Sequence, residues 1–217
     1  MICEDMVLKV LQNLRVLISK IKGKSMKIKI FQWILLIFLL PADLLYLLGG
    51  QKKVIDADLK RLLAETPYKK VGVLAFNYLL LINKPFRSIF YYRVRKSFVL
   101  KNISRIFIRP LNTIEINGRI KGGFRISHNY AVIHPESAGE NLFVGHGVTI
   151  GKNDREKGQQ RYPVIGDNVS IYANAVVFGS ITVGNNVLIG AGAVVNKDIP
   201  DNCTVVGNPC RIISHIR

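Results

Sequence analysis

The sequence is poor in cysteine and in acidic side chains, and both shortages limit what the protein can be. Its 217 residues include only Cys3, Cys203 and Cys210, with no Cys-x-x-Cys pair. Neither a disulfide framework nor a structural zinc site is therefore expected, and Cys203 and Cys210 are predicted to be packing residues. Asp and Glu number 14 against 31 Lys and Arg, which gives a net charge of +17. Hydrophobic residues make up 49% of the chain, too many for a disordered protein.

The excess of positive charge lies in the first half of the chain. Residues 1–110 contain 21 basic and 6 acidic side chains, whereas residues 111–217 contain 10 and 8. A surface that attracts an anionic partner therefore belongs to the first half. This uneven distribution argues against a uniformly basic nucleic-acid-binding protein, and no nucleic-acid partner is expected.

A long apolar run interrupts the basic half. Residues 30–42 carry no charge, and after Asp43 the apolar character continues to Leu48. A spanning helix needs about 20 apolar residues, and Pro41 breaks this run of similar length. Three interpretations of residues 30–48 stay open: a re-entrant or interfacial hairpin broken at Pro41, one spanning helix, or a buried helix. Lysines on both sides give no inside–outside bias and favour the hairpin.

Two further segments of the first half mix apolar and basic residues. Residues 5–22 have the three- and four-residue apolar spacing of an amphipathic helix, on a membrane surface or on its own domain. Residues 85–96 interleave aromatic and cationic side chains, which suits either lipid headgroups or packing against the second half. We divide the chain into amphipathic and apolar membrane-associating helices at 1–53, a basic helical region at 54–112, and a repeat domain at 113–217.

The repeat domain is built on a period of six residues. A small aliphatic residue recurs at Ile114, Ile120, Ile126, Val132, Ala138, Val144, Ile150, Ile165, Ile171, Val177, Val183, Ile189 and Val195. A strand has a period of two and a helix of 3.6, so a period of six instead predicts a three-sided solenoid of short parallel strands, 18 residues to a coil. The fifteen-residue step from Ile150 to Ile165 predicts nine extra residues as a loop within 151–164.

This repeat resembles that of the hexapeptide acyltransferases. The run Gly207-Asn208-Pro209-Cys210-Arg211-Ile212 is similar to the sequence that closes the family's β-helix, and residues 114–212 look most like the serine acetyltransferases and their polysaccharide O-acetyltransferase relatives. The resemblance implies a left-handed parallel β-helix, and so an α+β protein whose N-terminal helical, membrane-associating region precedes that domain. It also implies a homotrimer, acetyl-CoA as acyl donor and no metal.

Acetyl transfer from a thioester to an alcohol needs a base for the hydroxyl proton, and histidine is a common choice. His128 lies in a segment, 124–128, that resembles the one carrying the family's catalytic base. His146 is 18 residues further on and should stack beside it, whereas His134 falls one side further round. The family's orienting Asp is replaced by Thr113, and Glu115 is the candidate for that role.

The resemblance also implies where acetyl-CoA binds. Gly151, Ala173 and Ala191 match small residues that let the pantetheine arm approach the backbone between neighbouring β-helices. Lys197 and Arg211 are candidates for contacts with the phosphates. The alternative reading of the small residues is that tight solenoid turns need them.

The acceptor positions depart from the family pattern. Ser127 stands where the family has Asp, and the loop sequence Gln160-Arg161-Tyr162-Pro163 keeps the family's arginine but has Tyr162 in place of a histidine. An amino-acid acceptor needs charged partners, so Ser127, Arg161 and Tyr162 favour a neutral, hydroxyl-rich acceptor.

We therefore expect an acetyl-CoA-dependent O-acetyltransferase that acts on a sugar hydroxyl of a surface polysaccharide or its lipid-linked precursor. Its expected place is the cytoplasmic face of the bacterial inner membrane, as a peripheral or monotopic protein on the anionic surface. The alternatives are a serine O-acetyltransferase of cysteine biosynthesis and a non-enzymatic membrane-bound β-helix scaffold.

Overall fold

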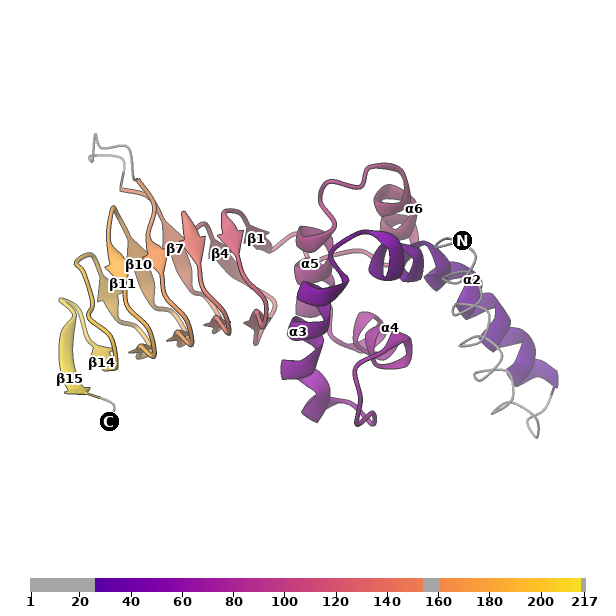
Figure 1. The fold of residues 1–217 in the computed structure, drawn as a ribbon, viewed down its shortest axis with the longest axis horizontal. Helices are drawn as coiled ribbons and strands as arrows, with labels where there is room; N and C mark the ends of the chain where they lie inside the picture. Colours follow the sequence, from indigo (N-terminus) through magenta and orange to yellow (C-terminus); the bar gives the residue numbers. More distant parts are fainter. Residues whose placement is uncertain (1–25, 154–160, 216–217) are drawn as a thin grey trace.

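The computed structural model describes residues 26–153 and 161–215, and it is an elongated molecule with helices at one end and a β-helix at the other (Figure 1). The helical region comprises α2 (Met26–Leu48), α3 (Lys52–Leu62), a 3-10 turn (Leu63–Glu65), α4 (Val73–Ile82), α5 (Lys84–Arg93) and α6 (Val99–Phe107). The amphipathic helix expected at 5–22 lies outside the described residues.

α2 contains the apolar run and continues through Pro41 as one helix, so the predicted hairpin broken at that residue is wrong. A proline inside a helix removes one backbone hydrogen bond. Packing of the turns around it offsets that cost, because Leu39, Ala42, Leu45 and Tyr46 are buried in the helical core. The buried-helix interpretation therefore fits this part of α2. Over the described ranges, no helix has the length and apolar character needed to cross a bilayer.

A buried polar pair links α2 to α4. The Asn77 Nδ2 donates to the Asp43 Oδ2 at 3.3 Å, while the Asp43 Oδ1 and the Asn77 Oδ1 are both buried without a hydrogen-bond partner. Burial raises the pKa of the Asp43 carboxyl from 3.8 to about 7, although the Asn77 bond opposes the rise. A neutral Asp43 carries a proton that it can donate to an oxygen, which is the atom type that both unpartnered groups present.

We expect Asp43→Asn to stabilise the protein at alkaline pH. The folded-state pKa of Asp43 is raised, so the folded protein holds the proton more tightly and its stability falls as pH rises from 3.8 through about 7. Asparagine is neutral throughout, and its amide can donate to Asn77. Thermal melting should therefore give the variant the higher Tm at pH 8.5 and a much smaller difference near pH 4. Parallel pH profiles of Tm for the two proteins would contradict this account of Asp43.

The second half forms a parallel β-helix with three sheets, as the six-residue period predicted. Sheet A contains β1 (Ile114–Ile116), β4 (Ala131–Ile133), β7 (Thr149–Gly151), β10 (Val176–Phe178) and β13 (Val194–Val195). Sheet B contains β2 (Arg119–Ile120), β5 (Ser137–Ala138), β8 (Val164–Ile165) and β11 (Thr182–Val183). Sheet C contains β3 (Arg125–Ile126), β6 (Phe143–Val144), β9 (Ser170–Ile171), β12 (Leu188–Ile189), β14 (Cys203–Val206) and the antiparallel β15 (Arg211–His215).

The aliphatic column of each sheet fills the interior. Twelve of the thirteen predicted repeat positions are buried; Val132 is half-buried, and its neighbours Ala131 and Ile133 point inward instead. Ile133 pairs with Ile150 on the next coil, so the turn after Ile126 is one residue longer than predicted and the following turn, with Pro135, is one shorter. Ala138 pairs with Ile165, 27 residues on, which confirms that nine extra residues leave the coil after β7.

The turns from sheet B to sheet C carry an asparagine ladder. Asn141, Asn168, Asn186 and Asn202 all have positive φ, and each side-chain amide donates to the next oxygen at 2.9–3.1 Å. Asparagine tolerates this left-handed conformation better than most residues do. The ladder therefore fixes this edge of the solenoid in a regular stack.

The helical region closes the first coil of the solenoid. The buried Arg93 of α5 binds the Asp58 carboxylate of α3 at 2.8 and 3.0 Å and also donates to the backbone oxygens of Ile120 and Lys121. Asp58 in turn accepts from the Phe124 N–H at 2.7 Å. Burial raises the pKa of Asp58, and the Arg93 guanidinium opposes the rise. These bonds replace those that a preceding coil would make.

The aromatic and cationic segment 85–96 is part of this closure. Phe86 and Phe90 are buried in the helical core, and the hydroxyl of Tyr92 donates to the Gly118 oxygen at 2.9 Å and accepts from the Ile120 N–H at 3.1 Å. The packing interpretation of this segment is confirmed, and the headgroup interpretation is wrong for its aromatic rings.

Candidate functional site

The predicted site residues gather on the two edges of sheet A. We call the turns from sheet C to sheet A, at 127–130, 145–148, 172–175 and 190–193, the histidine corner. We call the turns from sheet A to sheet B, which include residues 134–136 and 161–163, the loop corner. The described residues of the inserted loop leave and rejoin the coil at the loop corner (Figure 1).

His128 and His146 stack at the histidine corner, as their 18-residue spacing predicted. Their ring centroids are 5.8 Å apart at an interplanar angle of 84°, and both side chains are exposed. The exposed ring of Tyr130 lies 6.2 Å from that of His146. Two imidazoles and a phenol therefore face solvent together, where they can exchange protons with a bound ligand. The sequence reasoning missed Tyr130, although its place two residues after His128 was a usable signal.

The turn that carries His128 is held by backbone and hydroxyl contacts. The Ser127 N–H donates to the Val144 oxygen at 3.0 Å, and the Thr113 hydroxyl donates to the oxygen of Asn129, next to His128. Glu115, the predicted orienting group, lies elsewhere: its Oε2 is 3.6 Å from the Nε2 of His134. Within the described residues no contact joins Glu115 to His128, so the geometry favours Thr113 as the residue that positions this turn.

The histidine corner continues into the predicted coenzyme residues. Ala173 and Ala191 occupy the same turn on the next two coils, at spacings of 27 and 18 residues from His146 and from each other. Arg211 pairs with Val206 at the same edge on the last coil. One edge of the solenoid thus offers two histidines, two small residues and an arginine in line, which is the shape and chemistry for a long anionic ligand.

Gly151 and Lys197 lie on the other edge of sheet A, at the loop corner. A side chain built on Gly151 would meet no described atom within 4 Å, whereas one on Gly145 would come within 2.8 Å of the Ala173 nitrogen. Coil packing therefore accounts for glycine at Gly145 but does not require it at Gly151. The exposed Lys197 is close in sequence to β13, the last strand of sheet A.

The loop corner also holds a charged cavity of about 470 Å³. Tyr162 and His134 line it together with Asn117, Glu136 and two arginines, Arg95 and Arg119. Arg161, the neighbour of Tyr162, is exposed. Arg95 comes from the segment after α5, so no sequence pattern could have connected it to Tyr162. The cavity offers both signs of charge to a small ligand.

Comparison with known proteins agrees with this geometry. Residues 162–197 match the family model described as "Bacterial transferase hexapeptide (six repeats)". The serine acetyltransferase of Bacillus pumilus is 44% identical over 121 residues, which are 53% of this chain and 52% of that protein. The chain thus spans about half the length of the curated relatives it matches.

Solved structures extend the likeness into the helical region. The Neisseria gonorrhoeae serine acetyltransferase in complex with serine is 30% identical, with a TM-score of 0.58 over 76% of this chain and 70% of that one. The Brucella abortus serine acetyltransferase in complex with coenzyme A is 26% identical, with a TM-score of 0.55 over 80% of this chain and 71% of that one.

These relatives overturn the expected polysaccharide acceptor, because the matching proteins are serine acetyltransferases. The expectation rested on the absence of charged partners at Ser127 and Tyr162. The physical reason for the error lies in the cavity around Tyr162, where Arg95, Arg119 and Glu136 supply charges from other parts of the sequence.

Proposed function

Since the chain belongs to the serine acetyltransferase-like hexapeptide-repeat acetyltransferases, we propose that it transfers the acetyl group of acetyl-CoA to the hydroxyl of L-serine. The alternative of a serine O-acetyltransferase of cysteine biosynthesis thus becomes the main interpretation. The observation that carries it is the pair of stacked, exposed imidazoles of His128 and His146 in a chain whose relatives carry this name.

His128 is the general base of the proposed reaction. It takes the proton of the serine hydroxyl while the hydroxyl oxygen attacks the thioester carbonyl, so that an ester forms and the thiolate of coenzyme A leaves. His146 lies close enough to contact the same reacting groups. The contact from the Thr113 hydroxyl to the Asn129 oxygen supports a positioning role for Thr113.

Acetyl-CoA would lie along the histidine corner, past Ala173 and Ala191, with Arg211 near its phosphates. This direction is supported by the alignment of these residues on successive coils. Gly151 and Lys197, on the far edge of sheet A, fit the same ligand only if a second copy brings its loop corner alongside. We therefore propose a homotrimer of left-handed β-helices, in which one copy's histidine corner meets the neighbour's loop corner.

Serine would be held at the loop corner. A zwitterion needs a cation for its carboxylate and an anion for its ammonium group, and Arg161 and the charged residues around Tyr162 offer both. Ser127, at the start of the histidine corner, remains the candidate for the contact nearest the reacting hydroxyl.

The direct test is turnover. The purified chain is mixed with acetyl-CoA and L-serine, thiol release is followed, and O-acetylserine is identified by mass spectrometry. Serine-dependent thiol release supports the proposal. Acetyl-CoA hydrolysis without acetylated serine, or no turnover at all, would contradict it.

We also propose that the helical region docks on an anionic membrane, at the cytoplasmic face of the bacterial inner membrane. An exposed apolar surface on α2 and α6 supports this proposal; its members are Ile37, Phe38, Leu40, Phe98, Val99, Ile103, Ile106 and Phe107. The rings of Phe38 and Phe107 are 4.6 Å apart, which joins the two helices into one patch. Lys101, Arg105 and Arg109 accompany it, and cations beside an apolar face favour anionic lipid.

The double variant Phe98→Ser/Ile106→Ser tests the docking surface. These side chains are 75% and 65% exposed, so their loss should leave the fold intact. Burying each in lipid contributes roughly 1.5–3 kcal/mol, so vesicle binding should fall by about tenfold or more for each. Flotation with phosphatidylglycerol vesicles measures this, and Ile213→Ser, 56% exposed at the far end of the solenoid, is the matched control. Equal binding by all three proteins would exclude this surface.

A further inference from the structure

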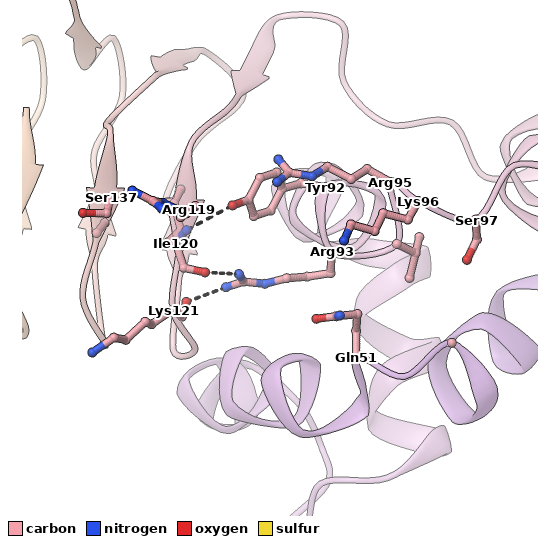
Figure 2. Close-up of a pocket in the computed structure, with 13 residues that line it drawn as sticks. Gln51, Tyr92, Arg93, Arg95, Lys96, Ser97, Arg119, Ile120, Lys121 and Ser137 are labelled. Carbon is pink, nitrogen blue, oxygen red and sulfur yellow. Dashed lines mark hydrogen bonds between the residues drawn. The ribbon is translucent and has the colours of Figure 1, made fainter. Parts of the chain in front are cut away.

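A second cavity, of about 510 Å³, lies where the helical region meets the first coil. Its walls come from the segment after α5 and from β2 and β5, and Gln51 closes one side (Figure 2). It adjoins sheet B, whereas the histidine corner lies between sheets C and A. The cavity is therefore separate from the residues assigned to acetyl transfer, apart from Arg95 and Arg119, which also line the cavity at the loop corner.

The lining of this cavity is strongly positive. Arg95, Lys96, Arg119 and Lys121 contribute cationic groups, and Ser97 and Ser137 contribute hydroxyls. None of the described residues that line it is an aspartate or a glutamate. Arg119 has an exposed ion pair with Glu136 at 3.2 Å, but neither Lys96 nor Lys121 has an acceptor in the described part of the chain. Like charges gathered without counterions repel one another, and an anion in their midst would relieve that repulsion.

The frame around these cations is rigid. Figure 2 shows Arg93 and Tyr92 reaching from α5 to the backbone of Ile120 and Lys121, with Lys96 beside them. The Arg93 charge is balanced by Asp58, so it fixes the cavity floor without competing for a ligand. The Arg95 guanidinium lies 4.8 Å from the centre of the Tyr92 ring, which orients it by a cation–π contact. A cluster held in this way needs little reorganisation to bind an anion.

We propose that this junction cavity binds a phosphate group. Four cations and two hydroxyls match the acceptor-rich oxygens of phosphate, which takes several charge-assisted hydrogen bonds at once. Phosphate can come from a soluble phosphorylated metabolite or from a lipid headgroup. The second source has geometric support, because Ser97 is followed directly by Phe98 and Val99, the most exposed apolar residues of the docking surface.

The test compares the full chain with the Lys96→Gln/Lys121→Gln variant, and with Lys60→Gln/Lys84→Gln as a control for lost charge at exposed lysines outside the cavity. Calorimetric titration with inorganic pyrophosphate probes the soluble source. Flotation with vesicles of phosphatidic acid, against phosphatidylserine vesicles matched in charge, probes the headgroup. Neither pair of lysines belongs to the acetyl-transfer site, so serine acetylation should be unchanged in both variants.

We expect the cavity variant to weaken binding by on the order of tenfold per lysine, while the control variant binds as the unaltered chain does. Loss confined to pyrophosphate assigns a soluble ligand, and loss confined to phosphatidic acid assigns a lipid headgroup. Equal weakening in cavity and control variants, competition by coenzyme A, or no binding of either probe would overturn the proposal.

Discussion

Replacing His128 by alanine lowers kcat for serine acetylation by roughly 10²–10⁴-fold, the usual contribution of a general base. The side chain is exposed and its ring contacts are limited to His146, so the variant should melt at the same temperature as the unaltered protein. The KM for serine should change little, because the base acts on the proton in flight rather than on the bound zwitterion. Steady-state thiol release at varied serine concentrations separates the two constants.

His215→Ala is the matched histidine control, since His215 ends β15 at the far end of the solenoid. Its kcat should equal that of the unaltered protein. If His128→Ala kept near-normal turnover, the base would have to be sought at His146, and the assignment of the site would be wrong. If both variants lost activity equally, the effect would be structural.

Replacing Arg93 by alanine destabilises the protein by about 3–5 kcal/mol, the range for breaking a buried ion pair by removing one partner. Three losses combine here. Asp58 remains as a buried carboxylate with no cation, and the backbone oxygens of Ile120 and Lys121 lose their donors. Urea denaturation followed by circular dichroism measures the change in the free energy of unfolding.

Arg93→Lys provides a graded comparison. Lysine keeps the charge but lacks the planar fork that serves Asp58 and two carbonyls together. Its destabilisation should fall between that of Arg93→Ala and that of Lys84→Ala, an exposed position at the start of the same helix. A small effect for Arg93→Ala would show that water satisfies the end of the first coil as well as the guanidinium does.

The solenoid could be predicted from the sequence because its interior is periodic. Positions such as Val144, Ile171 and Ile189 repeat the same environment on successive coils, so each reports the others. The prediction failed at Val132, where one turn gained a residue and the next lost one, because two compensating changes leave the average period at six. The stack of His128 on His146 was predictable for the same reason: an 18-residue spacing is one coil.

The junction could not be predicted. Asp58 and Arg93 are 35 residues apart in two different helices, and a charged pair carries no periodic signal that would connect them. Arg95 and Tyr162 are similarly distant in the chain although they line one cavity. Pro41 misled the prediction of α2 because a local rule for helix breaking takes no account of the packing that Leu45 and Tyr46 provide.

Both ends of the β-helix are covered, and this sets the protein's behaviour toward other copies of itself. An uncovered coil presents a row of unpaired backbone groups, which is a template for stacking another coil without limit. At one end Tyr92 and Arg93 occupy those groups; at the other, β15 turns back antiparallel on β14 and interrupts the parallel register. The molecule is thereby kept from elongating end to end into a fibre, and its sides are left as the surfaces on which it can associate.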